Sequence, residues 1–126
     1  CDYRHGTGHG IGSVMCVHED GVKFSPKFVK PIVAGSVCSD EPGYYKEGEY
    51  GIRIENVLVC EQITDKKLFF GSLTLVPIDL EAIELTLLTE VEKKWINNYH
   101  KNIKLILKDY LSDDEFLWLE NKYYEI

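Results

Sequence analysis

The sequence lacks long apolar runs and any excess of positive charge. Its longest apolar runs, such as LTLVPI, are far shorter than the roughly 20 residues that a membrane-spanning helix needs. The 14 basic and 21 acidic side chains give a net charge of -7, which provides no attractive field for nucleic acid or anionic lipid. We therefore expect no nucleic-acid partner, no membrane partner and a cytoplasmic location.

A closely spaced cysteine pair is also missing. Cys1, Cys16, Cys38 and Cys60 contain no C-x-x-C motif of the kind that binds zinc or exchanges disulfides. Three of the four lie in apolar or strand-like runs, where a cysteine usually behaves as a small hydrophobic residue. Reduced thiols are expected.

The chain is long enough for one folded domain. Its 126 residues are 44% hydrophobic and 12% aromatic, too apolar for a disordered chain. It begins with Cys rather than Met, and a histidine cluster follows almost at once. We expect a fragment of a longer polypeptide.

The residue pattern changes from strands to helices along the chain. β-branched runs punctuated by Gly and Pro predict antiparallel strands within residues 32–41, 50–62 and 67–78, and EPGYYKEGEYG predicts a hairpin with a longish loop. Thr89 with Glu92, and Ser112 with Glu115, form capping boxes that predict two helices. On the first helix the apolar face is predicted to hold Val91, Trp95, Tyr99, Ile103, Ile106 and Tyr110.

Charged side chains interrupt the apolar strands. Strand alternation places Arg53 and Glu55 on one face, and Glu41 on the face of Ser39. A carboxylate in apolar surroundings is costly unless it is paired or bound to a metal. A surface ion pair and a metal site both remain open interpretations.

Three of the four histidines lie between positions 5 and 18. The glycines around His5 and His9 disfavour a helix, and in an extended chain these residues are about 13 Å apart, too far for both to ligate one metal. His18 follows a strand-like apolar run over 13–17. A lone histidine is commonly an ordinary hydrogen-bonding residue, but His and carboxylate together suit a metal site.

Several motifs together resemble a known family. HGTGHGIG, VHE, SDEPGYY, GIRIENV and LTLVP follow the order and approximate spacing of the C-terminal half of the catalytic domain of aminopeptidase P (Xaa-Pro aminopeptidase), and LLTEVEKKWINNYH resembles the extension of the eukaryotic cytosolic type. The resemblance implies an α+β fold class: the C-terminal part of a pita-bread fold, with antiparallel β-strands followed by C-terminal helices. Residues 1–85 would be the catalytic half and residues 86–126 the helical extension.

The resemblance also implies a chemistry: a metallopeptidase that removes the N-terminal residue when proline follows it. Such enzymes use two divalent ions, often manganese, with zinc or cobalt as alternatives. Carried over by position, His9, Glu41 and Glu55 are metal ligands. His18, Glu41 and His5 are the catalytic residues, with His5 and His18 also contacting the substrate, and Arg53 orients the carboxylates.

The chain departs from the family because the two aspartate ligands that the family supplies from upstream strands have no counterpart here. We therefore expect the fragment alone to be inactive and to bind at most one metal ion, weakly. Missing neighbours would also expose strand edges, so we expect a homo-oligomer, most simply a dimer. The alternatives are a non-catalytic peptide- or protein-binding module of the same fold and a small cupin-like barrel, whose H-x-H signature is absent.

Overall fold

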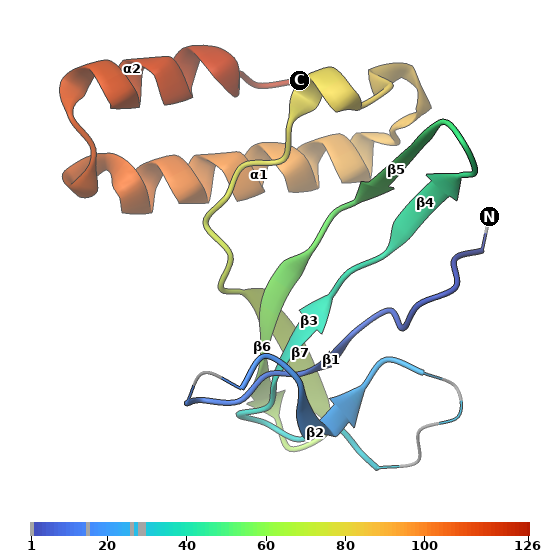
Figure 1. Cartoon of the computed structure of the whole chain (residues 1–126). Coiled ribbons are helices and arrows are strands. Elements are labelled where there is room, and N and C mark those ends of the chain that lie inside the picture. The colour runs from blue at the N-terminus through green and yellow to red at the C-terminus, as the bar shows by residue number, and fades with distance from the viewer. Residues whose placement is uncertain (1, 15, 26, 28–29) are drawn as a thin grey trace. The chain divides into compact units, whose positions relative to one another are not determined.

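The computed structural model describes residues 2–14, 16–25, 27 and 30–126. Its contacts divide the chain into two compact units, one ending at Thr74 and the other beginning at Leu75 (Figure 1). The boundary between these units comes before the expected boundary between the catalytic half and the helical extension, at residues 85 and 86. That functional boundary stays a prediction. Each unit is described by itself below.

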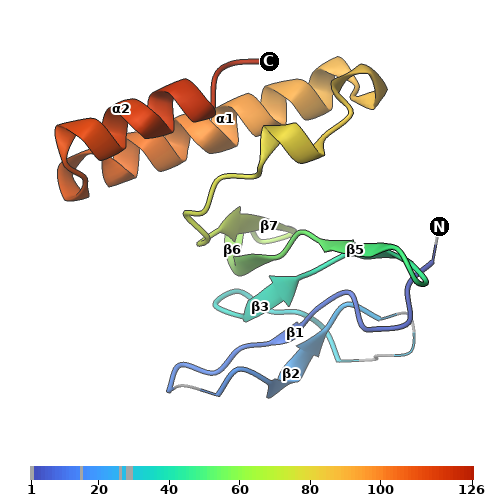
Figure 2. The same ribbon diagram turned by 45° about the horizontal axis from the view of Figure 1, so that its top comes forward.

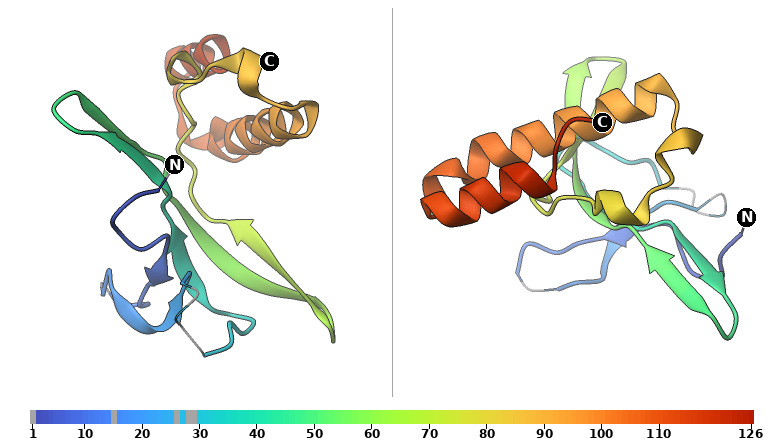
Figure 3. Two further views of the ribbon diagram at one scale, coloured as in Figure 1. Left: turned by 90° about the vertical axis from the view of Figure 1, so that its right-hand side faces the viewer. Right: turned by 90° about the horizontal axis from the view of Figure 1, so that it is seen from above.

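The first unit is built on a five-stranded antiparallel sheet in the order β2-β1-β3-β6-β7. The strands are β1 (His9–Gly10), β2 (Glu19–Lys23), β3 (Val37–Asp40), β6 (Asn56–Thr64) and β7 (Lys67–Ser72). The strands β6 and β7 form a long hairpin around a turn at Asp65 and Lys66 (Figure 3). The strand expected over 67–78 ends at Ser72, and a further backbone hydrogen bond joins the Leu73 amide to the Val57 carbonyl of β6 (2.8 Å).

A second hairpin extends the β3–β6 pair. It consists of β4 (Gly43–Lys46) and β5 (Tyr50–Arg53), and it keeps the register of the larger ladder, since Asp40 pairs with Asn56 and Gly43 with Arg53. The prediction of one continuous strand within residues 50–62 is therefore wrong, because the strand is interrupted between β5 and β6. The expected hairpin is present, but it turns tightly at Gly48 (φ 74°) instead of through a longish loop.

The apolar run before His18 is not a strand, which corrects a second expectation. Val14 and Val17 are 84% and 65% exposed, and β2 begins only after His18. The Gly12 amide donates a hydrogen bond to the carbonyl of Cys16 (2.8 Å), which closes a tight loop here. Met15 lies outside the described residues.

Two cysteines lie at the centre of the sheet. Cys38 and Cys60 are 0% and 1% exposed, and burial raises the pKa of the Cys38 thiol. Cys16, Cys38 and Cys60 are free thiols, as expected, and Cys1 lies outside the described residues.

The second unit contains the two expected helices, α1 (Glu90–Leu107) and α2 (Asp113–Lys122). Both predicted capping boxes form, Thr89 with Glu92 and Ser112 with Glu115. The helices pack side by side (Figure 2). Short 3-10 turns at Leu80–Ala82 and Leu85–Leu87 precede α1, and another at Lys108–Tyr110 links it to α2. No helix in the described part of the chain has the length and apolarity needed to cross a bilayer.

The buried face of α1 differs from the predicted one. Tyr99 and Ile103 are buried as expected, together with Ile96 and His100. The other predicted members, Val91, Trp95, Ile106 and Tyr110, are exposed. Steps of four residues advance by slightly more than one turn of 3.6 residues, so this series winds off the buried face.

Candidate metal centre

The Glu41 carboxylate lies just beyond β3 and is held there by the segment that leads into β1. The Glu41 amide donates to the Thr7 carbonyl (2.7 Å), and the Ser39 hydroxyl donates to Glu41 Oε1 (3.1 Å). A Cβ on Gly8 would overlap the Ser39 carbonyl oxygen, so the close crossing of the two segments requires glycine at this position. Glu41 is 8% exposed, so its charge is largely removed from water.

His9 faces this carboxylate. Its Nδ1 lies 2.9 Å from the Gly10 carbonyl, which can only accept, so Nδ1 carries the hydrogen. Its Nε2 lies 3.3 Å from Glu41 Oε1. In a neutral ring Nε2 presents a lone pair toward a carboxylate oxygen, an arrangement that is favourable only with a proton or a metal cation between them.

The donor set at this point fits a divalent metal ion. An imidazole whose Nδ1 is hydrogen-bonded to a carbonyl has its Nε2 oriented for ligation, as is usual for metal-binding histidines. Imidazole and carboxylate together suit zinc, manganese and cobalt. His9 and Glu41 are therefore able to hold a cation between them.

Arg53 lies on the other side of the same carboxylate. Its Nη1 is 3.4 Å from Glu41 Oε2, and its Nε donates to the Tyr45 hydroxyl (3.0 Å). The Tyr45 hydrogen bond, and to a lesser extent the charges of Glu41 and Glu55, raise the pKa of Arg53 above its ordinary value. Arg53 thus anchors Oε2 while Ser39 anchors Oε1.

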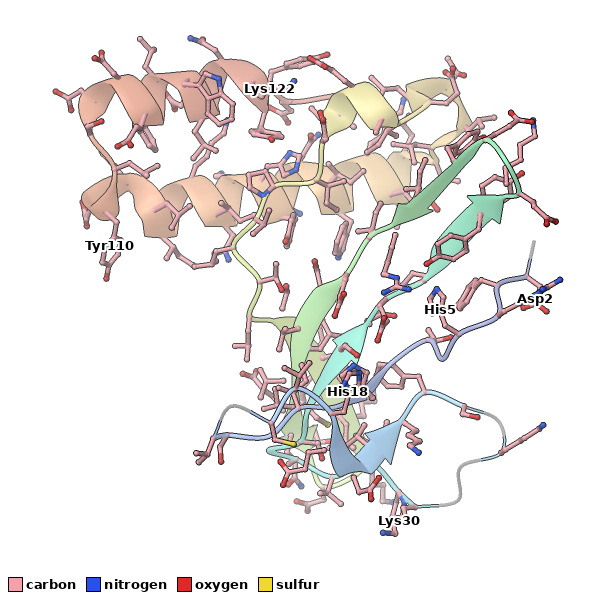
Figure 4. The ribbon with its side chains drawn as sticks, in the orientation of Figure 1. Asp2, His5, His18, Lys30, Tyr110 and Lys122 are labelled. Atoms are coloured by element: carbon pink, nitrogen blue, oxygen red, sulfur yellow. The ribbon has the colours of Figure 1, made fainter. Side chains whose placement is uncertain are left out.

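Tyr45 links Arg53 to His5. The His5 Nε2 lies 2.7 Å from the Tyr45 hydroxyl, and its Nδ1 lies 2.7 Å from the Gly6 carbonyl. For a neutral His5 ring the donation runs from Arg53 Nε–H to the Tyr45 oxygen, and from the Tyr45 O–H to His5. Figure 4 shows His5 beside the β4–β5 hairpin. All three side chains line a cavity of about 670 Å³.

His18 stacks against His9, with ring centroids 4.1 Å apart and the rings inclined by 36°. It is exposed and lies at the loop that precedes β2 (Figure 4). His18 and His5 therefore have different partners. His18 packs against the candidate ligand His9, and His5 contacts the β4–β5 hairpin through Tyr45.

Glu55 lies in the gap between β5 and β6. The register shared by the two ladders places it opposite Glu41, and the Ile54 amide donates to the Pro42 carbonyl (3.3 Å) within the same gap. Glu55 is exposed. Within the described residues no group of three or more His, Cys, Asp or Glu side chains is close enough to hold a metal ion, so His9 and Glu41 form the closely approaching pair and Glu55 stands across the gap.

Two residues of this network, Ser39 and Tyr45, were not predicted to have a role in the site. Strand alternation placed Ser39 on the face of Glu41, but it did not identify the Ser39 hydroxyl as a hydrogen-bond partner of His9 and Glu41. The Tyr45 ring lies over Gly43 and Gly51, where a Cβ would collide with it. Gly43 lies two residues before Tyr45 on the same strand, and Gly51 is its partner on β5. Glycines at these two positions are a sequence signal that the tyrosine ring lies flat over the hairpin.

The comparisons with known proteins agree with the architecture. A sequence model of metallopeptidase family M24 matches residues 1–62, and a model of the C-terminal region of peptidase_M24 matches residues 66–126. The protein named Probable Xaa-Pro aminopeptidase P from Botryotinia fuckeliana is 42% identical over an alignment that covers 96% of this chain and 20% of that protein. The protein of the same name from Aspergillus flavus is 41% identical, with the same coverage.

A solved structure shares the fold. The X-prolyl aminopeptidase from Caenorhabditis elegans, described as a cytosolic enzyme with a di-nuclear active site, matches 99% of this chain and 22% of its own length, with a TM-score of 0.87 and 36% identity. This confirms the expected fold class, antiparallel strands followed by C-terminal helices. The chain spans about a fifth of the length of these relatives. Because the two M24 models together match nearly all of its residues, the chain belongs to metallopeptidase family M24.

Proposed function

We propose that this chain is the C-terminal part of a dinuclear metalloaminopeptidase that releases the N-terminal residue from peptides with proline in second position. The observation that carries the proposal is the approach of His9 Nε2 to Glu41 Oε1, in a family-M24 chain whose relatives are named Xaa-Pro aminopeptidases. We infer that residues 1–85 complete the catalytic domain and that residues 86–126 form its helical extension.

The metal ligands in this proposal are His9, Glu41 and Glu55. The proposed metals are two divalent cations, manganese first, with zinc or cobalt as alternatives, and the remaining ligands come from outside this chain. When bound, two such cations lower the pKa of a shared water and polarise the peptide carbonyl. The C. elegans relative, described as di-nuclear, supports the number of ions.

The side chains of this chain supply proton transfer and orientation. Glu41, fixed by Ser39 and Arg53, accepts the proton of the attacking water. His18, exposed beside His9, donates a hydrogen bond to the oxygen on which negative charge develops. His5 lies in the cavity with Tyr45 and Arg53, where it contacts the substrate.

By itself the 126-residue chain is proposed to be inactive and to bind at most one ion weakly, because it supplies only part of the ligand set. The chain is also proposed to be cytosolic and to self-associate, most simply as a homodimer. Exposed apolar side chains on α1, including Trp95 (52%) and Leu105 (73%), support self-association, and the description of the C. elegans relative as cytosolic supports the location. Light scattering at micromolar concentration tests the dimer, which a monomeric mass would contradict.

The test of function is Xaa-Pro hydrolysis by the full-length protein, measured with and without a chelator. Chelator-sensitive release of the N-terminal residue is expected, and Glu55→Ala is expected to abolish it. If the protein supplied with manganese binds Xaa-Pro peptides without hydrolysing them, the proposal of an enzyme is contradicted and the alternative of a non-catalytic binding module is supported.

A further inference from the structure

We propose that Ser39 is a positioning residue of this centre: its hydroxyl fixes His9 against Glu41 and so sets the affinity of the site for its divalent ion. The inference rests on the proposed function, because it assigns a role within the same metal centre. Ser39 belongs to neither the predicted ligands nor the predicted catalytic residues.

The hydroxyl joins the two candidate ligands directly. Ser39 is 0% exposed, and its Oγ accepts a hydrogen bond from the His9 amide (3.0 Å) while donating to Glu41 Oε1 (3.1 Å). The direction is determined, because an amide N–H can only donate and a carboxylate can only accept. One hydroxyl therefore satisfies one group from each ligand residue.

The backbone around His9 gives this hydroxyl particular weight. β1 is only two residues long, and its pairing with β2 shifts register between His9 and Gly10. Its pairing with β3 is registered at Gly10 opposite Cys38. The His9 amide donates its hydrogen bond to the Ser39 side chain of β3 rather than to a backbone carbonyl. The Ser39 hydroxyl therefore replaces a backbone hydrogen bond of the sheet at the proposed ligand His9.

The contact also determines how the carboxylate is presented. The oxygen that accepts from Ser39 is the one that lies 3.3 Å from His9 Nε2, while Oε2 is turned toward Arg53. A neutral hydroxyl orients Oε1 without neutralising its charge, so the carboxylate keeps its electrostatic attraction for a cation. Loss of partners that orient metal ligands typically weakens metal affinity about 10- to 100-fold.

The experiment compares Ser39→Thr with Ser39→Val in the full-length protein. These two side chains have nearly the same shape, and only threonine carries the hydroxyl, so their difference isolates the hydrogen bonds from the change in volume. The dissociation constant for Mn²⁺ is measured by isothermal titration calorimetry, and the thermal unfolding of the metal-free protein is measured beside it.

We expect the threonine variant to bind Mn²⁺ more tightly than the valine variant, by about 10- to 100-fold. Equal affinity of the two variants, with the wild-type protein binding normally, overturns the role of Ser39 and leaves the proposed function standing. A wild-type protein that neither binds Mn²⁺ nor cleaves Xaa-Pro peptides overturns both.

Ser39→Ala covers the case in which the larger side chains do not fit the fully buried position. It is compared with the wild-type serine, since alanine adds no volume. Mn²⁺ binding about 10-fold weaker or more, by a metal-free protein that is still folded at the temperature of the titration, supports the positioning role. Unchanged Mn²⁺ affinity contradicts it, and so does weaker binding that is explained by unfolding of the metal-free variant at that temperature.

Discussion

The Nε2 atom of His9 lies 3.3 Å from Oε1 of Glu41, while the Nδ1 atom of the same ring lies 2.9 Å from the Gly10 carbonyl. These contacts orient the free lone pair of the ring toward a largely buried carboxylate. The pair comes from β1 and from the end of β3, which meet at the glycine-dependent crossing of Gly8 over Ser39. The fold therefore brings the two proposed metal ligands together from two separate segments.

Replacing Glu41 by glutamine removes the charge of this pair with little change in shape. In the full-length protein, Glu41→Gln is expected to weaken Mn²⁺ binding by about 100-fold or more, because a neutral amide oxygen is a much poorer ligand than a carboxylate. Calorimetric titration measures the change. Glu61→Gln, at an exposed position on β6, is the matched control. Equal affinities of the two variants would remove Glu41 from the ligand set.

The Tyr45 hydroxyl connects His5 with Arg53 and is expected to contribute to activity. Tyr45→Phe removes one donor to His5 and one acceptor from Arg53. We expect kcat/KM for an Xaa-Pro peptide to fall about 10-fold, which corresponds to the loss of about 1.4 kcal/mol of transition-state stabilisation.

The neighbouring tyrosine supplies the control for this change. Tyr44 is similarly exposed, at 41% against 45% for Tyr45, but its ring packs near Tyr50, with centroids 6.0 Å apart. Tyr44→Phe is expected to leave kcat/KM near the wild-type value. If both phenylalanine variants behave like wild type, the link from Arg53 to His5 has no role in the reaction.

Local sequence patterns predicted the helices well and the strands less well. The capping boxes at Thr89 and Ser112 form because they depend on residues three positions apart. The gap between β5 and β6 was missed because the run of β-branched and apolar residues continues through Ile54. The interruption comes from the opposite segment, between β3 and β4. It contains Pro42, which has no amide hydrogen to donate to the ladder.

For the site, too, local sequence patterns predicted some features and missed the contacts between distant segments. Alternation correctly placed Ser39 with Glu41, and the glycines correctly excluded a helix from His5 to His9. The contact of His9 with Glu41 depends on a crossing between distant segments, so no local pattern contains it. Tyr45 was overlooked because tyrosine in a hairpin is commonly a packing residue, and its role depends on which partners its hydroxyl meets.

The cysteines should differ sharply in their reactivity toward alkylating reagents. Cys38 and Cys60 are buried, and burial raises the pKa of the Cys38 thiol, which keeps it in the unreactive thiol form. Cys16 is exposed. Iodoacetamide labelling followed by peptide mass mapping should modify Cys16 in the native protein, and Cys38 and Cys60 only after denaturation. Labelling of Cys38 at the rate of Cys16 in the native protein would contradict the buried sheet core.

His100 should make the stability of the helical unit depend on pH. It is 3% exposed and accepts a hydrogen bond from the Ile78 amide at Nε2 (3.1 Å). Burial, and then the nearby charge of Lys104, lower the pKa of His100 below its ordinary value near 6.5. The folded state then binds fewer protons than the unfolded state, so the stabilisation is complete above pH 6.5 and is lost as the pH falls through the lowered pKa.

Thermal unfolding of the full-length protein between pH 5 and 8 tests this linkage. The wild-type unfolding temperature should decline toward acid more steeply than that of His100→Gln, whose amide oxygen can still accept from Ile78 but does not titrate. Parallel declines in the two proteins would show that His100 contributes no pH dependence.

The metal content of the purified full-length protein tests the central claim most directly. Elemental analysis after loading with manganese and gel filtration should give two ions per chain for the wild type, and a clear loss for the double variant His9→Ala and Glu55→Ala, whose positions lie on β1 and in the gap before β6. A wild-type protein without bound metal, or a double variant that retains both ions, would contradict the assignment of the site.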